Sequence, residues 1–198
     1  MGSNRSELTG KVPVLNIANV LTVVRILLVP VFIYLFLRGD TTSQIWATIT
    51  FMIAAATDQL DGHLARSRSL ITDFGKLADP IADKALVIAA LALLSATGLV
   101  PWWVTILIVV RELGITVLRF FMVRRSVMAA SRGGKVKTVL QMLFITLMLV
   151  PWTGLGLGGF GHTMVTVAEV IMWAALAVTV VTGLEYCVSA WRIARRTP

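Results

Sequence analysis

Six long apolar runs, separated by short polar segments, constrain this chain more than any other feature. The runs lie at residues 16–37, 44–63, 80–98, 101–123, 138–153 and 164–190. A helix needs about 20 mostly apolar residues to cross a bilayer, and only the fifth run is short, unless it extends backward through Lys135 and Lys137. Charged residues make up only 14% of the chain, against roughly 25% in soluble domains. We therefore predict an all-α, polytopic membrane protein with six transmembrane helices.

The basic residues are distributed unevenly between alternate connections. Connections one, three and five contain Arg38 as their only Lys or Arg, and the opposite side collects most of the others. The positive-inside rule places both termini in the cytoplasm of a cell-membrane protein. Topology and anionic lipid thus account for the net charge of +8, and we expect no nucleic-acid partner. We expect one integral membrane domain over residues 1–198, in which residues 1–15 form a cytoplasmic segment, either interfacial or irregular.

Five of the six aspartates fall within residues 57–84, next to apolar runs on both sides. Asp58 and Asp61 are three residues apart, Asp79 and Asp83 are four apart, and each pair would share one face of a helix. Four carboxylates close together repel one another and take up protons, and hydrocarbon nearby adds a desolvation cost. Divalent cations remove both problems, and oxygen-only ligands favour Mg²⁺, Mn²⁺ or Ca²⁺. Two ions about 4 Å apart could clamp a phosphoryl displacement.

Each acid also has a simpler interpretation. Asp79 before Pro80 fits a helix N-cap with proline at the first helical position. Asp83 could form a surface ion pair with Lys84, and Asp58 could be a proton-relay acid of the kind found in transporters. These alternatives explain single residues, whereas a metal cluster explains all four acids together.

The segment between the two acid pairs contains glycines and arginines that suit an anionic ligand. It can form a turn that brings the two helix faces together. Gly62 and Gly75 allow a backbone or ligand to approach closely, although either could be a plain turn residue. Arg66 is placed to hold a phosphate by bidentate hydrogen bonds. We interpret Asp73 as a solvated loop charge outside the pattern.

In order, these residues read Asp58-x-x-Asp61-Gly62-x-x-Ala65-Arg66, eight residues, then Gly75-x-x-x-Asp79-x-x-x-Asp83. This order resembles the signature of the CDP-alcohol phosphotransferase family at every position. The resemblance implies the family's six-helix membrane fold and the transfer of a phosphatidyl or related group from a CDP-linked donor to an alcohol, with release of CMP.

The resemblance also implies roles for individual residues. The four acids would hold two Mg²⁺ ions, with Mn²⁺ as an alternative, and Asp83 would act as general base for the incoming hydroxyl. The positions implied for CDP-diacylglycerol are Asn19, Thr22, Gly62, Ala65, Arg66, Thr72 and Gly75. A homodimer is expected from the family.

Three further segments, "NIANVLTVVRILLVPVF", "RELGITVLRFF" and "GGKVKTVLQM", resemble the phosphatidylglycerophosphate synthases of this family. Those enzymes use CDP-diacylglycerol and sn-glycerol 3-phosphate, and an acceptor that carries a phosphate needs a cationic pocket. The candidates are Arg111, Arg119, Lys135 and Lys137. Arg111 could instead pair with Glu112, and the two lysines could be positive-inside anchors.

Three other functions remain open at this point. A sister enzyme of the family could use inositol phosphate, phosphatidylglycerol or serine as the acceptor. A small cation or proton-coupled transporter would place its acids near the bilayer midplane, often in repeated halves, and no internal repeat is visible. A non-catalytic lipid-binding scaffold would have no use for four acids at metal-binding spacing.

Overall fold

Six α-helices make up the part of the chain that the computed structural model describes. This part comprises residues 17–68, 73–122 and 132–196, and side chains are described over 20–57, 81–82, 84–117 and 136–189. The helices are α1 (Ile17–Leu37), α2 (Thr41–Arg68), α3 (Asp73–Ala96), α4 (Trp102–Met122), α5 (Arg132–Leu149) and α6 (Gly159–Arg196). The described residues form no strand, so the all-helical prediction is confirmed.

Two helices are longer at the acidic segment than the sequence analysis expects. α2 continues to Arg68, and α3 begins at Asp73, so Pro80 lies inside α3. The N-cap interpretation of Asp79 is therefore wrong, as is the loop position of Asp73. The helical period is already present before the proline, because Phe74, Leu77, Ala78 and Ile81 follow i, i+3, i+4 and i+7 spacing.

The same extension corrects the turn expected through the two glycines. Gly62 lies within α2 and Gly75 lies within α3, so both are helical residues. The connection between these helices is limited to residues 69–72, which the structure does not describe. α5 begins before Lys135 and Lys137, as the sequence analysis allows.

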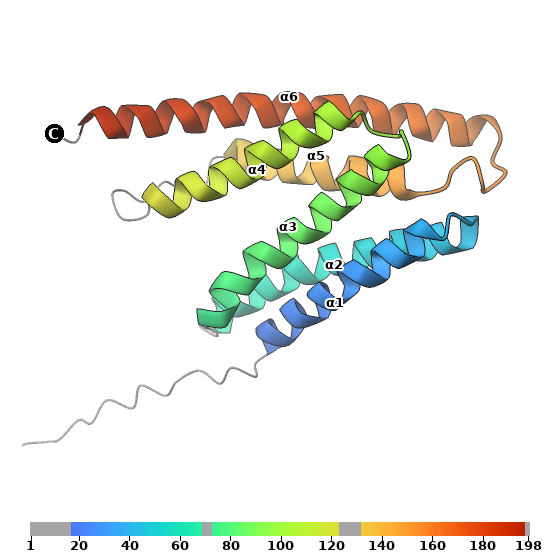
Figure 1. Cartoon of the computed structure of the whole chain (residues 1–198), viewed down its shortest axis with the longest axis horizontal. Coiled ribbons are helices and arrows are strands. Elements are labelled where there is room, and N and C mark those ends of the chain that lie inside the picture. The colour runs from blue at the N-terminus through green and yellow to red at the C-terminus, as the bar shows by residue number, and fades with distance from the viewer. Residues whose placement is uncertain (1–16, 69–72, 123–131, 197–198) are drawn as a thin grey trace, which may run out of the picture.

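α3 occupies the centre of the helical arrangement. It contacts α1, α2, α4 and α5, while α1 packs along α2 and α5 packs along α6. Figure 1 shows α3 crossing obliquely between the α1–α2 pair and the group formed by α4, α5 and α6. Residues near the middle of α3 thus face side chains from several other helices.

Successive helices run in alternating directions, which gives the bundle two distinct ends (Figure 1). We call the end where α2 finishes and α3 begins the motif end; α1 and α5 begin there, and α4 and α6 finish there. The opposite end, the loop end, carries the connections at residues 38–40, 97–101 and 150–158. All four acids of the motif therefore lie on helix segments toward one end of the bundle.

At the loop end, α3 finishes in a compact hydrogen-bonded turn. Gly98 has a φ of +78°, and its N–H donates to the Ser95 carbonyl at 3.1 Å while the Leu99 N–H donates to the Leu94 carbonyl at 3.0 Å. This is the Schellman arrangement, which satisfies the last helical carbonyls and favours glycine in the left-handed conformation. The Ser95 and Thr105 hydroxyls, 2.7 Å apart, then join α3 to α4.

The start of α2 is capped by an acid. The Asp40 carboxylate accepts a hydrogen bond from the Ser43 N–H at 2.9 Å, as an N-cap residue does. This bond, with smaller contributions from the Ser43 hydroxyl and from Arg38 at 3.6 Å, holds the pKa of Asp40 below its ordinary value.

The core is apolar, and so is much of the surface. Buried side chains such as Phe32, Phe51, Leu91, Ile108 and Phe144 form one cluster between the helices. Many large apolar side chains are nevertheless exposed on the outer faces, which soluble monomers rarely tolerate. Within the described residues, Val20–Leu37 and Gly159–Ser189 are long and apolar enough to cross a bilayer. These two candidate spans fall short of the six expected.

Candidate active site

The four motif acids all lie in helices. Asp58 and Asp61 belong to the second half of α2, and Asp79 and Asp83 belong to the first half of α3. Because the backbone is helical at all four positions, the spacings of three and four residues place each pair of acids on one face of its helix. The two helices that carry them, α2 and α3, contact each other. Their side chains lie outside the described set, and the described residues contain no group of three or more metal-binding side chains. Metal binding by the four acids stays a prediction, which their all-oxygen donor set fits.

The residues expected on the nucleotide side fall in two regions. Gly62, Ala65 and Arg66 are in α2 and Gly75 is in α3, and Thr72 lies outside the described residues. On α1, Asn19 is helical but its side chain is not described. Thr22 is described and is 1% exposed.

Arg25, which the sequence analysis did not single out, lies one turn after Thr22 on the same face of α1. It is fully buried, with 0% exposure. An arginine within an apolar run is costly without an anionic partner, so its position in "TVVRILL" was a usable signal of a functional or structural role.

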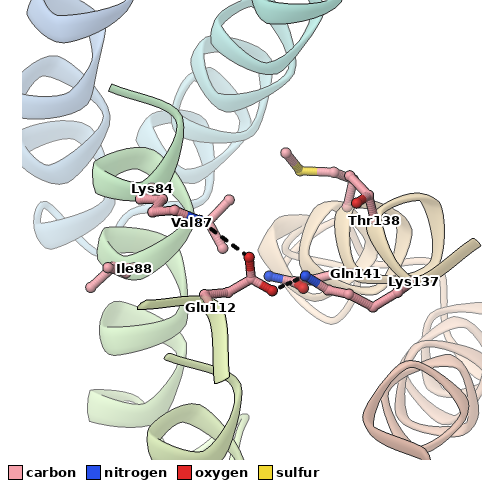
Figure 2. Close-up of a pocket in the computed structure, with 8 residues that line it drawn as sticks. Lys84, Val87, Ile88, Glu112, Lys137, Thr138 and Gln141 are labelled. Atoms are coloured by element: carbon pink, nitrogen blue, oxygen red, sulfur yellow. Dashed lines mark hydrogen bonds and ion pairs between the residues drawn. The ribbon is translucent and has the colours of Figure 1, made fainter. Parts of the chain in front are cut away.

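A cluster of polar side chains surrounds Glu112 on α4, and Figure 2 shows three of its members, Lys84, Glu112 and Lys137. Lys84 of α3 donates to Glu112 Oε2 at 3.3 Å. Arg111 donates through Nη1 to Glu112 Oε1 at 3.2 Å, and Lys137 of α5 donates to the same Oε1. Three basic side chains from three helices thus share one carboxylate, and we call these four residues the Glu112 cluster.

The Glu112 cluster carries more positive than negative charge. Three cations and one carboxylate leave a net charge of +2, and none of the four side chains is more than 19% exposed. Lys137, with 4% exposure, is too deeply buried for the surface anchor that the positive-inside interpretation requires. Three basic side chains gathered in one small region favour an anionic group beside them. The arrangement is therefore suited to binding a dianionic group such as a phosphate.

Arg111 is held on its other side by α6. Its Nη2 donates to the Thr182 hydroxyl at 2.8 Å, and that hydroxyl is buried. The next residue, Gly183, leaves room for the arginine stem, since a Cβ there would lie 3.3 Å from Arg111 Cγ. Thr182 and Gly183 thus position the guanidinium beside Glu112.

A cavity of about 50 Å³ opens beside the Glu112 cluster. Its lining comes from α3, α4 and α5: Lys84, Val87, Ile88, Glu112, Lys137, Thr138, Gln141 and Met142. At roughly 10–15 Å³ for one water-sized group, the cavity admits a few small polar groups. Its polar residues are Lys84, Glu112 and Lys137 of the cluster, together with Thr138 and Gln141 (Figure 2).

The structure brings together some of the residues expected to bind the acceptor. Arg111 and Lys137 meet at Glu112, so the Arg111–Glu112 pair proposed as an alternative exists. Arg119 lies in α4 and Lys135 in α5, but their side chains are not described. Lys84 was weighed only as a partner of its neighbour Asp83, and its bond to Glu112 was missed because sequence alone does not show which helices adjoin.

Comparisons with known proteins agree on one protein family. The sequence model of a family described as CDP-alcohol phosphatidyltransferase matches residues 15–181. The chain is 42% identical over 189 residues to a probable phosphatidylglycerophosphate synthase of Mycobacterium tuberculosis strain H37Rv, covering 94% of this chain and 87% of that protein.

Two further relatives carry the name CDP-diacylglycerol–glycerol-3-phosphate 3-phosphatidyltransferase. The protein from Bacillus subtilis strain 168 is 36% identical over 189 residues, covering 89% of this chain and 95% of its own length. The protein from Escherichia coli K12 is 40% identical over 140 residues, covering 68% of this chain and 76% of its own length.

Proposed function

The chain belongs to the CDP-alcohol phosphatidyltransferase family, and we propose that it is a phosphatidylglycerophosphate synthase. In this reaction the phosphatidyl group of CDP-diacylglycerol passes to sn-glycerol 3-phosphate, which yields phosphatidylglycerol phosphate and CMP. The observation that carries the proposal is that relatives with this activity in their names align along most of the chain. The Glu112 cluster supports it independently, because three basic side chains gathered at one place suit an acceptor that carries a phosphate.

The donor would bind at the motif end. We assign its CDP group to Asn19, Thr22, Gly62, Ala65, Arg66, Thr72 and Gly75, with its acyl chains in the surrounding lipid. Thr22 is buried on α1, and α1 contacts both α2 and α3, so α1 adjoins both helices that carry the motif.

Members of the family generally use divalent metal ions, and we assign two Mg²⁺ ions to Asp58, Asp61, Asp79 and Asp83, with Mn²⁺ as an alternative. When bound, the ions would neutralise charge on the donor pyrophosphate. The helical backbone at all four positions supports this assignment.

We propose direct transfer with Asp83 as general base. The Asp83 carboxylate accepts the proton of the acceptor's 1-hydroxyl as the hydroxyl oxygen attacks the β-phosphorus of the donor. An oxygen–phosphorus bond to the acceptor forms, the bond between the β-phosphorus and the CMP oxygen breaks, and CMP leaves. Arg111, Arg119, Lys135 and Lys137 hold the acceptor phosphate.

The same proposal includes the membrane arrangement. All six helices cross the cell membrane within a single domain spanning residues 1–198, and the motif end faces the cytoplasm together with both termini. Two lines of support are the excess of Lys and Arg in the connections at the motif end and the alternating helix directions. We also propose that the protein acts as a homodimer, as expected from its family.

The transporter alternative is less well supported. The four acids lie on helix segments toward one end of the bundle, whereas a transporter would place them near the bilayer midplane, between structural repeats. A sister enzyme with a different acceptor is the nearest rival, and the test must therefore compare acceptors.

The test measures CMP release by the purified protein in lipid-supplemented detergent with Mg²⁺ and CDP-diacylglycerol. The acceptors are sn-glycerol 3-phosphate, inositol phosphate, phosphatidylglycerol and serine, each also assayed with a chelator in place of Mg²⁺. We expect metal-dependent release with sn-glycerol 3-phosphate only. Fastest release with another acceptor would refute the proposed acceptor, and release in the presence of chelator would refute the metal assignment.

The base is tested by Asp83→Asn, with Asp73→Asn as the matched control on the same helix. We expect the first substitution to lower turnover by roughly 10²- to 10⁴-fold, the usual contribution of a general base, and the second to leave it near the wild-type value. Near-normal turnover by Asp83→Asn would contradict its role as base.

A further inference from the structure

Gln141 places a hydrogen-bond acceptor in the wall of the cavity beside the Glu112 cluster. The residue is 4% exposed, and its Oε1 accepts no hydrogen bond from any residue that the structure describes. It lines the same cavity as Lys84, Glu112 and Lys137, and in Figure 2 its side chain extends from α5 toward Glu112. A buried acceptor without a donor is costly, so this oxygen points to a donor that arrives with a ligand.

The chemistry of the donor follows from the neighbours of Gln141. Lys84 and Lys137 donate to Glu112 Oε2 and Oε1. The Glu112 carboxylate has no proton to donate to the amide oxygen of Gln141. A ligand with a hydroxyl can donate to the amide oxygen while its anionic group remains near the cations. Lys137 and Gln141 are four residues apart on one face of α5, with Cβ atoms about 5–6 Å apart. This separation suits a ligand that carries a phosphate and a hydroxyl on adjacent carbons.

We propose that Gln141 determines acceptor specificity by accepting a hydrogen bond from the non-reacting 2-hydroxyl of the phosphorylated acceptor. The proposal rests on the proposed function, because it assumes an acceptor whose phosphate binds the cations. The 1-hydroxyl reacts and the basic residues hold the phosphate. The 2-hydroxyl donates a hydrogen bond to the amide oxygen of Gln141. A small phosphorylated alcohol that lacks this hydroxyl leaves the amide oxygen without a donor.

The experiment compares kcat/KM for sn-glycerol 3-phosphate and for 3-hydroxypropyl phosphate, which keeps the phosphate and the reacting hydroxyl but has no 2-hydroxyl. The wild type should prefer sn-glycerol 3-phosphate by roughly 5- to 150-fold, the range expected when a buried polar group loses its partner. Gln141→Met has similar length and no amide, and it should bring the ratio close to one. Gln44→Met, at the loop end of α2, should keep the wild-type ratio.

Each outcome decides the proposal. A wild type that uses both acceptors equally would show that water or another group satisfies Gln141, and it would overturn the proposal even if Gln141→Met failed to fold. An unchanged ratio in a folded Gln141→Met would overturn it as well. If the wild type releases no CMP with sn-glycerol 3-phosphate, the proposed function itself fails. Turnover with an unaltered ratio refutes only the role of Gln141.

Discussion

Replacing Glu112 with glutamine removes the one negative charge of the Glu112 cluster and nearly preserves its shape. Lys84 and Arg111 lie 3.3 Å and 3.2 Å from its oxygens, and Lys137 donates to the same carboxylate. At an effective dielectric constant of about 20, each of these two pairs contributes roughly 5 kcal/mol of attraction before desolvation is subtracted. The variant removes the carboxylate that these three cations share.

The net cost is smaller than the sum of these attractions. Breaking a buried ion pair by removing one partner costs about 3–5 kcal/mol, and we expect the lower end because the glutamine carbonyl still accepts a hydrogen bond. For a chain of this size, about 3 kcal/mol corresponds to a fall of roughly 6–12 °C in apparent Tm. Inorganic phosphate should recover part of this loss, because an anion that binds the folded state stabilises it.

Thermal unfolding of the purified protein in detergent measures this fall. The matched control is Glu169→Gln on α6, where the carboxylate is exposed and pairs with no cation among the described residues. The control should change Tm by no more than about 2 °C, as most surface substitutions do. Equal Tm values for the two variants, with or without phosphate, would refute the electrostatic account of the Glu112 cluster.

Two further predictions test positions outside the cluster itself. Gly183→Val should push the Arg111 stem away from α6, weaken its 2.8 Å bond to Thr182, and raise KM for sn-glycerol 3-phosphate by roughly tenfold or more. Gly114→Val, where a Cβ meets nothing within 4 Å, should leave KM unchanged, and equal KM values would contradict the positioning role of Gly183. Asp40→Asn keeps the α2 cap without its charge and should lower Tm at neutral pH. Because the folded-state pKa of Asp40 lies below its ordinary value of 3.8, its charge stabilises the fold fully above that value, and the difference in Tm should shrink as the pH falls through the folded pKa. A difference that stays constant through the acid range would contradict this account.

Much of the helical framework could be predicted because apolar runs of sufficient length leave few alternatives. The ends of the helices were less predictable at the acidic segment. Asp79-Pro80 is typical of a helix start, and only the apolar spacing from Phe74 onward reveals that α3 has already begun. α6 likewise continues to Arg196, beyond the apolar run that indicated it, because basic residues with good helix propensity can extend a helix into water.

The residues of the candidate site also differ in how well the sequence alone could predict them. The spacing of Asp58, Asp61, Asp79 and Asp83 is local, so the sequence alone suffices to propose it, and it stays a prediction. The meeting of Lys84, Glu112 and Lys137 depends on which helices adjoin, and no local pattern encodes that. Gln141 carried a signal, since it is a polar residue within an apolar run, but its neighbours were needed to suggest a role.

The central position of α3 has a consequence for how acceptor preference can be altered by engineering. Asp83 and Lys84 are consecutive residues, so their Cα atoms are only about 3.8 Å apart, and the first is assigned to the transfer chemistry while the second contacts Glu112. A substitution that reshapes the acceptor pocket from α3 would also disturb the proposed base. The opposing wall of the cavity is built from α4 and α5, and neither the proposed base nor the proposed metal ligands lie on these helices. Variants with new acceptor preferences are therefore best sought among residues of α4 and α5. α3 is best left unchanged, because it contributes both to the proposed transfer chemistry and to the acceptor pocket.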